Sequence, residues 1–145
     1  MPLTSDEDIA KLLTDARTIA VVGCSDRPDR PSYGVAESLQ RHGYRMLPVN
    51  PTITGERVHG EFVWRELGQI GVPIDIVDIF RRPDAAGDAV DDAIAAGAKA
   101  VWMQLGVVNE EAAARAEAAG LQVVMDRCIK IELMRLRVPT IEATG

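Results

Sequence analysis

Short apolar runs rich in β-branched residues alternate along the chain with segments in which apolar residues recur every three or four positions. The first pattern is typical of strands buried on both faces, and the second of helices with one buried face. The alternation predicts an α/β protein with a three-layer, doubly wound parallel sheet, because parallel strands are joined by helices that cover both faces. Five strands are predicted, over residues 18–23, 44–50, 74–80, 99–104 and 121–126.

Polar caps and glycine stops mark the ends of the predicted helices. Ser5 can cap a helix ahead of the first strand, and its apolar positions share one face. Further helices are predicted over 34–42 after Ser32, from Asp84 to Gly97, from Asn109 to Gly120, and over 129–136 before Pro139. No linker or repeat interrupts this order. We therefore expect a single domain over 1–145, with its core at 18–132, a short N-terminal helix and a short C-terminal tail.

Charge and hydropathy narrow the classes of function. The chain has 145 residues and a net charge of −6, whereas a protein that binds nucleic acid normally presents a basic surface. No run approaches the roughly 18 apolar residues of a membrane span, and the first residues are acidic, unlike a signal peptide. We expect a cytoplasmic protein that binds neither nucleic acid nor membrane. Cys24 and Cys128 have no metal-ligand spacing and are expected to be free thiols.

Basic residues gather just after three of the predicted strands, in an otherwise acidic chain. They are Arg27 and Arg30 after the first strand, Arg81 and Arg82 after the third, and Arg127 and Lys130 after the fifth. Ligands of parallel sheets bind beyond the carboxyl ends of the strands. Such a cluster, together with a helix N-terminus, suits an anion such as a pyrophosphate. The alternative is that these side chains pair with Asp26, Asp29, Asp84 and Asp126 on a solvated rim.

The loop after the first strand lacks the G-x-G-x-x-G pattern of nicotinamide-dinucleotide sites. Gly23 is followed by Cys24 and Ser25, and the next glycine is Gly34. A loop of this length cannot reproduce the tight turn and close helix packing of that pattern. The second strand ends in Asn50 and Pro51, where a dinucleotide enzyme usually has an acidic residue for the ribose. A neutral Asn50 suits a phosphorylated ribose, although an Asn-Pro pair also often begins a turn.

Four segments resemble the small stand-alone CoA-binding domain proteins: GCSDRPDRPSYGVAESLQRHGYRMLPVNP, VDIFRRP, WMQLGVVNEEAAARA and VMDRCIKIE. The resemblance covers residues 18–132 and implies a Rossmann-like fold, similar to the N-terminal domain of the succinyl-CoA synthetase alpha subunit. It implies coenzyme A or an acyl-CoA as ligand. The implied binding residues are Gly23, Cys24, Ser25, Arg27, Arg30, Ser32 and Tyr33 near the pyrophosphate loop, Asn50 and Pro51 beside the adenosine, and Phe80, Arg81, Gln104, Leu105 and Gly106 along the rest of the groove.

Candidate catalytic residues are few. His42 precedes a glycine stop and His59 lies in a Val-His-Gly loop, so both are expected to be structural. Cys24 could gain reactivity from the next helix N-terminus, but no histidine is near it in sequence. The sequence therefore predicts a non-catalytic CoA-binding protein without a metal and with no identified protein partner. The alternatives are a nicotinamide-dependent oxidoreductase and a small acyl-transfer enzyme that uses Cys24.

Overall fold

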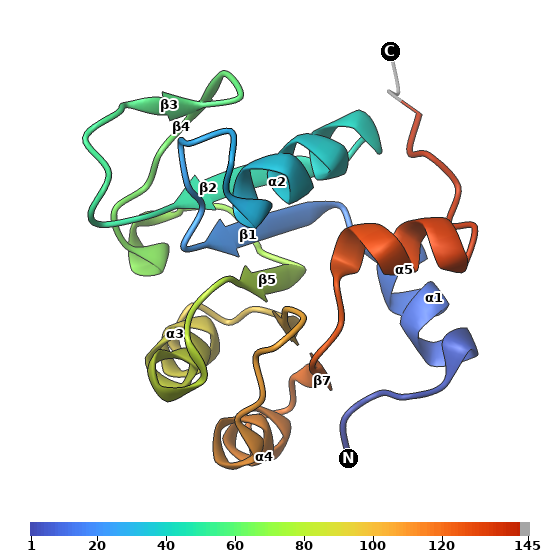
Figure 1. Ribbon diagram of the computed structural model, residues 1–145. Helices are drawn as coiled ribbons and strands as arrows, with labels where there is room; N and C mark the ends of the chain where they lie inside the picture. The colour runs from blue at the N-terminus through green and yellow to red at the C-terminus, as the bar shows by residue number, and fades with distance from the viewer. Residues whose placement is uncertain (143–145) are drawn as a thin grey trace.

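The computed structural model describes residues 1–142 and contains a five-stranded parallel sheet (Figure 1). The strand order is β2-β1-β5-β6-β7, with neighbours paired in parallel. The strands are β1 (Thr18–Val22), β2 (Arg45–Val49), β5 (Ile76–Ile79), β6 (Ala100–Met103) and β7 (Gln122–Val124). The predicted α/β fold is confirmed. Every predicted strand is present but shorter, because the flanking residues belong to the connecting loops.

Helices cover both faces of the sheet, as Figure 1 shows. One face carries α1 (Asp6–Asp15), α2 (Pro31–Arg41) and α5 (Ile129–Arg135), and the other carries α3 (Pro83–Ala95) and α4 (Glu110–Ala118). Each face has its own apolar core, because successive side chains of a strand point to opposite faces. No helix within residues 1–142 is long and apolar enough to cross a membrane.

The helix caps explain where the prediction of helix ends succeeded and where it failed. Ser5 accepts a hydrogen bond from the N–H of Asp8 at 3.1 Å, so the predicted cap of α1 is confirmed. Helix α2, in contrast, begins at Pro31 rather than at residue 34. Proline suits the first helical position because its φ is already helical and it has no N–H to leave unpaired. Ser32 therefore lies inside the first turn of α2.

The connection from β2 to β5 contains elements that the sequence did not reveal. They are β3 (Arg57–Val58), β4 (Glu61–Phe62) and the 3₁₀ turn η1 (Leu67–Gln69). Strands of two residues are too short to show a period of two. Trp64 extends the edge of the sheet, because its N–H donates to Pro48 O and its O accepts from the N–H of Asn50.

The strand order creates the crevice in which ligands of this architecture bind. β1 lies between β2 and β5, so the chain leaves β1 for one neighbour through α2 and later returns to the other side of β1. The loops at the carboxyl ends of β1 and β5 therefore diverge to opposite faces of the sheet, and a crevice forms between them.

Candidate ligand-binding cleft

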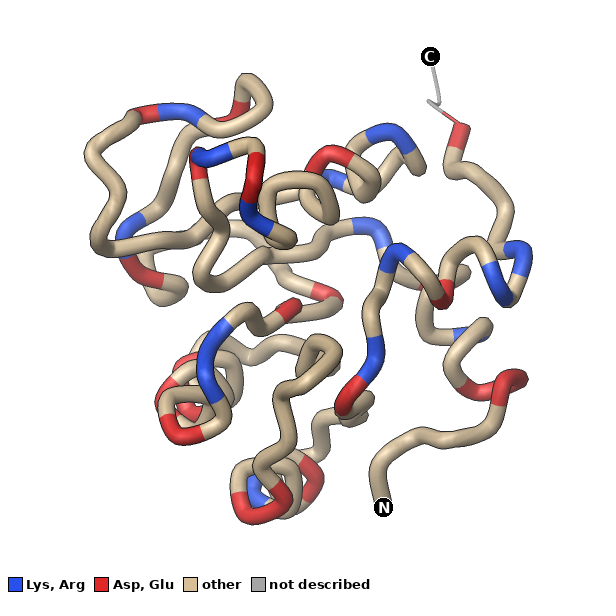
Figure 2. Tube along the Cα trace, viewed as in Figure 1, with Lys and Arg blue, Asp and Glu red and all other residues tan. Residues whose placement is uncertain are grey.

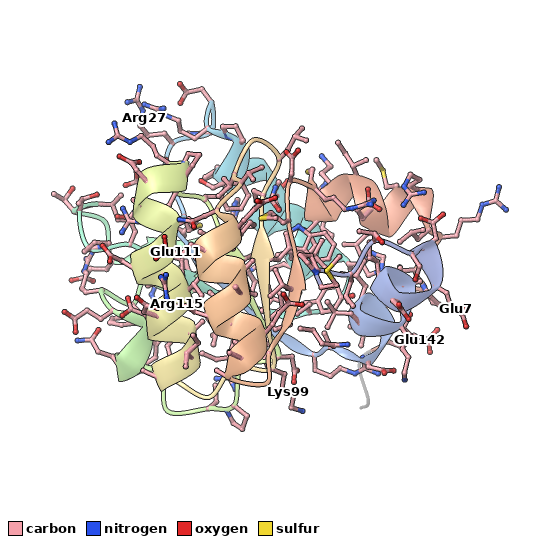
Figure 3. The ribbon with its side chains drawn as sticks, turned by 90° about the horizontal axis from the view of Figure 1, so that it is seen from below. Glu7, Arg27, Lys99, Glu111, Arg115 and Glu142 are labelled. Atoms are coloured by element: carbon pink, nitrogen blue, oxygen red, sulfur yellow. The ribbon has the colours of Figure 1, made fainter. Side chains whose placement is uncertain are left out.

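A cleft of about 780 Å³ lies at the carboxyl ends of β1, β5 and β6, beside α2 and α5. Its volume is in the range of small-molecule and cofactor sites. Figure 3 shows the orientation: Arg27, which lines the cleft, stands at one end of the molecule, and Lys99, just before β6, at the other. Most of the residues singled out by sequence line the cleft, namely Gly23, Ser25, Arg27, Arg30, Ser32, Asn50, Phe80, Arg81, Gln104, Leu105 and Gly106.

Three of the predicted binding residues do not line the cleft. Cys24 is fully buried in the core beneath α2. Tyr33 packs its ring against His59, with the ring centroids 4.2 Å apart, and its O accepts from His59 Nε2 at 2.7 Å. Pro51 is exposed beside the cleft. Cys24 and Tyr33 thus support the fold around the cleft, and their side chains do not face a ligand in it.

Several lining residues were not predicted as binding residues. They are Asp26, Pro31, Val35, Thr52, Ile53, Arg82, Pro83, Val107, Cys128 and Ile131. Arg82 belonged to the basic cluster noted in the sequence, and Cys128 follows the fifth strand, so position alone could have found both. Ile53 and Ile131 carry no such signal, because they reach the cleft only through the packing of a long loop and of α5.

A glycine is required where the chain leaves β1. Gly23 has a φ of +84°, and a Cβ at this position would overlap the carbonyl O of Phe80 at the end of β5. A side chain would therefore meet both an unfavourable backbone conformation and a backbone clash. Gly23 allows the first loop to approach the end of β5 closely, and both Gly23 and Phe80 line the cleft.

Two serines organise the loop from β1 to α2. Ser32 Oγ accepts a hydrogen bond from the N–H of Ser25 at 2.9 Å, and Ser25 Oγ accepts from the N–H of Arg27 at 3.0 Å. The N-cap residue Arg30 provides no side-chain hydrogen bond to α2. Pro31 has no N–H, and the N–H of Tyr33 donates to Arg30 O at 3.1 Å. The first turn of α2 therefore offers the cleft mainly the positive end of its dipole, which favours an anion.

The arginines that line the cleft differ in how far they are neutralised. Arg27 lies 3.6 Å from Asp29, and Arg82 lies 3.1 Å from Asp84, in exposed pairs that contribute little stability. Arg30 and Arg81 make no ion pair within residues 1–142. Figure 2 shows basic segments in the loop after β1 and at the start of α3, interleaved with acidic ones. Two of the four arginines therefore pair with aspartates on the rim, as one interpretation predicted. The other two, Arg30 and Arg81, remain available to bind an anion.

The remaining two members of the basic cluster do not line the cleft. Arg127 lies 3.6 Å from the largely buried Glu132 of α5, so this arginine holds α5 against the loop that precedes it. Lys130 is exposed on α5. The charge available to a ligand therefore comes from the loops after β1 and β5 and not from the loop after β7.

Asn50 serves the turn that follows β2. Its Nδ2 donates to Cys24 O at 2.9 Å, and its Oδ1 accepts from both the N–H and the Oγ1 of Thr52 at 2.9 Å. Arg65 then holds the following loop through the carbonyl oxygens of Asn50, Ile53 and Gly55. Asn50 was expected either to lie beside a phosphorylated ribose or to begin a turn, and these hydrogen bonds favour the turn. The side chain borders the cleft while its polar atoms bind the protein itself.

Gln104 joins the cleft to α5. Its Oε1 accepts a hydrogen bond from the N–H of Ile129, the first residue of α5, at 3.1 Å. Gln104 is 5% exposed, and its Nε2 makes no hydrogen bond within the described part of the chain. That amide group is therefore available to donate a hydrogen bond to a ligand in the cleft.

The two cysteines are free thiols in different surroundings. Burial raises the pKa of Cys24 to about 12, and the nearby acidic side chains Asp78 and Asp26 add to this shift. A thiol with such a pKa is almost entirely protonated at neutral pH and is a poor nucleophile. Cys128 is only half-buried and lines the cleft. The environment of Cys24 thus gives no support to the alternative of a nucleophilic Cys24.

Both histidines make structural contacts. His59 Nε2 donates to Tyr33 O, and its own O accepts from Gln40 Nε2 at 3.1 Å, so it ties the β3–β4 turn to α2. His42 at the end of α2 stacks on Tyr44 and contacts Pro139 O at 3.0 Å. Over residues 1–142, no group of three His, Cys, Asp or Glu side chains is placed to hold a metal ion.

Comparison with known proteins gives relatives along nearly the whole chain. The family described as CoA binding domain matches residues 17–134. The uncharacterized protein YneT of Bacillus subtilis (strain 168) is 41% identical over 127 residues, which are 88% of this chain and 93% of YneT. A hypothetical protein from Pyrococcus horikoshii OT3 is 39% identical with a TM-score of 0.88, over 94% of this chain and 96% of that one.

A larger enzyme shares the fold. The dinucleotide forming acetyl-coenzyme A synthetase 1 of Ca. Korarchaeum cryptofilum is 23% identical, with a TM-score of 0.67 over 78% of this chain and 26% of that protein. At this identity the likeness concerns the fold alone. The present chain is therefore similar in fold to one part of that synthetase.

Proposed function

The chain belongs to the family of CoA-binding domains, and from this premise we propose that the cleft binds coenzyme A without catalysing a reaction on it. The proposal rests mainly on one observation: Arg30 and Arg81 line the same cleft as the N-terminus of α2. Neither arginine makes an ion pair within residues 1–142. A diphosphate would gain charge-assisted hydrogen bonds from the arginines and dipole stabilisation from the helix.

The order of the strands suggests how the ligand would lie. The diphosphate would bind at the loop after β1, between Ser25 and the first turn of α2. The adenosine would then extend toward the loop after β2, where Thr52 and Ile53 line the cleft. The pantetheine arm would extend the other way, past Phe80 toward Gln104, whose free amide group can donate to one of its carbonyl oxygens.

The environment of Cys24 supports a binding role over acyl transfer. Acyl transfer needs a thiolate that can reach the ligand, whereas Cys24 is fully buried and its pKa is raised to about 12. The sequence of the loop after β1 also disfavours a nicotinamide dinucleotide as the ligand. Its path through Ser25, Arg27 and Arg30 to Pro31 lacks the second and third glycines that let a dinucleotide pyrophosphate approach the backbone.

Calorimetric titration of the purified protein with CoA, NAD and NADP tests the proposal. We expect CoA to bind with a micromolar or lower Kd, and NAD to bind at least about tenfold more weakly, a difference of about 1.4 kcal/mol. Thermal unfolding in the presence of each ligand gives an independent measure, because a ligand that binds only the folded state raises the Tm. Equal affinities for CoA and NAD would overturn the proposal.

Two arginine variants distinguish a contact in the cleft from the general effect of removing one positive charge. Arg30→Ala should weaken CoA binding by about 1.5–3 kcal/mol, and the loss should shrink as salt is added. Arg45→Ala is the matched control, because Arg45 is exposed at the opposite end of the sheet, at the start of β2. If the two variants bound CoA with equal affinity, Arg30 would not belong to the site.

A further inference from the structure

Large apolar side chains remain exposed along one end of the cleft. Leu105, in the loop after β6, is 65% exposed, and Ile131 on α5 is 48% exposed; both line the cleft. Met134 is 66% exposed and lies three residues beyond Ile131, so it shares that face of α5. We call Leu105, Ile131 and Met134 the apolar strip. Burial of such side chains against an apolar ligand lowers the free energy of the complex, because their surface leaves water.

The charged and the apolar side chains that line the cleft come from different loops. The arginines come from the loops after β1 and β5, whereas Leu105 follows β6 and Ile131 lies on α5, which follows β7. In the sheet, β5 lies between β1 and β6, so at about 4.8 Å per strand the loop that carries Arg30 and the loop that carries Leu105 begin about 10 Å apart, with the loop of Arg81 between them. Helix α5 packs beside α2 on one face of the sheet. The cleft therefore has arginines on the loops after β1 and β5, and apolar side chains on the loop after β6 and on α5.

From this arrangement we infer that the apolar strip is a subsite for the acyl chain of a CoA thioester, so that the preferred ligand carries a chain of several carbons. The inference rests on the proposed CoA site. A CoA thioester has its phosphates at one end and its acyl group at the far end of the pantetheine arm, which matches the order of charged and apolar residues in the cleft. With the diphosphate at α2, the thioester would lie near Gln104 and Cys128.

The length of the strip sets the length of chain that it favours. Ile131 and Met134 are separated by nearly one turn of α5, a rise of about 4.5 Å. An acetyl group would end near Leu105 and Ile131, whereas an octanoyl chain could also cover Met134. Each methylene group that leaves water on binding strengthens the complex, so affinity should rise with chain length until the strip is covered.

Titration with CoA, acetyl-CoA and octanoyl-CoA tests the subsite. We expect octanoyl-CoA to bind at least about tenfold more tightly than acetyl-CoA. If CoA and both thioesters bind with the same Kd, the subsite is refuted, and the apolar strip is then better explained as a contact for another protein. If CoA itself does not bind, the failure lies in the proposed function and not in the subsite alone.

A pair of surface variants shows whether the chain-length effect arises at the strip. Met134→Ser should lower the ratio of the acetyl-CoA Kd to the octanoyl-CoA Kd by at least about threefold. Phe62→Ser is the control, because Phe62 is a similarly exposed apolar residue on β4, away from the cleft. The subsite is overturned if Met134→Ser keeps the wild-type ratio, or if Phe62→Ser lowers the ratio equally.

Discussion

The hydroxyl group of Ser32, in the first turn of α2, accepts a hydrogen bond from the backbone N–H of Ser25, which follows β1 by only a few residues. The distance is 2.9 Å, and Ser32 is 4% exposed. This contact closes the loop that carries Arg27 and Arg30, and it acts together with the hydrogen bond from the N–H of Arg27 to Ser25 Oγ. The path of the loop relative to the helix N-terminus therefore depends in part on one buried hydroxyl group.

Replacing Ser32 by alanine should damage stability and binding together. Ser32→Ala leaves the N–H of Ser25 without a partner, which should lower the free energy of unfolding by about 1–3 kcal/mol. The released loop should also weaken CoA binding several-fold, because the arginines must be reordered on binding. Urea unfolding and calorimetric titration measure the two effects.

Ser38→Ala provides the control on the same helix. The Ser38 side chain makes no hydrogen bond within residues 1–142, and Ser38 lies in the second half of α2. Its replacement should change neither quantity appreciably. A Ser32→Ala protein with wild-type CoA affinity would mean that the closed loop is not needed for the site.

A second prediction concerns the turn after β2. Asn50→Asp removes the Nδ2 group that donates to Cys24 O and brings a carboxylate toward that carbonyl. We expect the free energy of unfolding to fall by about 1–3 kcal/mol. CoA and dephospho-CoA should then lose affinity to a similar degree, because the damage acts through the turn.

The comparison of wild type and Asn50→Asp with CoA and dephospho-CoA forms a two-by-two cycle, whose coupling energy isolates any direct effect on the ribose phosphate. A coupling energy near zero supports the turn. A loss of about 1–2 kcal/mol confined to CoA would instead place the phosphate beside residue 50, as expected for two like charges partly screened by solvent.

Most of the residues that line the cleft could be predicted, because the position of such a cleft depends on where the strands end. Apolar runs located the strands, and ligands of a parallel sheet bind beyond the carboxyl ends, so Ser25, Arg30, Arg81 and Gln104 could be named in advance. Side-chain direction could not be predicted in this way. The family resemblance implied Tyr33, whose ring packs against His59 and does not line the cleft.

Residues brought in by packing could not be found from the sequence. Ile131 lines the cleft because α5 packs beside α2, and Ile53 because Arg65 holds the loop after β2 through three carbonyl oxygens. Neither relation leaves a local pattern in the sequence. Cys24 was implied by the family resemblance, but its side chain enters the core, while Ser25 next to it lines the cleft.

The two thiols give a third prediction. Cys128 is half-buried in the cleft, whereas Cys24 is fully buried and its pKa is raised to about 12. Iodoacetamide at neutral pH should therefore alkylate Cys128 and leave Cys24 unmodified, because the thiolate is the reactive form. Bound CoA should slow the modification of Cys128. Mass spectrometry of peptides measures both rates.

The labelling tests two separate points, which are the path of the pantetheine arm and the burial of Cys24. If CoA binds but does not protect Cys128, the pantetheine arm does not extend toward α5. If Cys24 is alkylated as fast as Cys128, the first loop opens readily in solution and the thiol of Cys24 is accessible. Cys128→Ser, which removes the reactive thiol with little change of volume, serves as the control for the assignment.

The last prediction comes from a carboxyl group in the centre of the sheet. Asp78 of β5 lies between Val21 of β1 and Trp102 of β6, is fully buried, and neither of its oxygens has a hydrogen-bond partner within the described residues. Burial raises its pKa well above the usual value for aspartate. The folded protein therefore holds this group in its neutral form over a range of pH in which the unfolded chain ionises it.

The sign of the effect on stability follows from the number of protons bound. Below about pH 4, Asp78 is protonated in both states and its ionisation has no effect. As the pH rises above this value, the unfolded state releases the proton and the folded state keeps it, so the free energy of unfolding falls by up to about 1.4 kcal/mol per pH unit. The fall ends once the pH exceeds the raised pKa of the folded state.

Asp78→Asn, which cannot ionise, should therefore be more stable than wild type at neutral pH, by at least about 1 kcal/mol. The difference should vanish toward pH 4 and grow as the pH rises, whereas a simple packing effect would be the same at every pH. Urea unfolding from pH 4 to pH 8 measures it, with Asp88→Asn on the exposed face of α3 as the control for loss of one negative charge. A difference that stays constant over this range would show that Asp78 ionises alike in both states, and its carboxyl group would then need a partner other than residues 1–142.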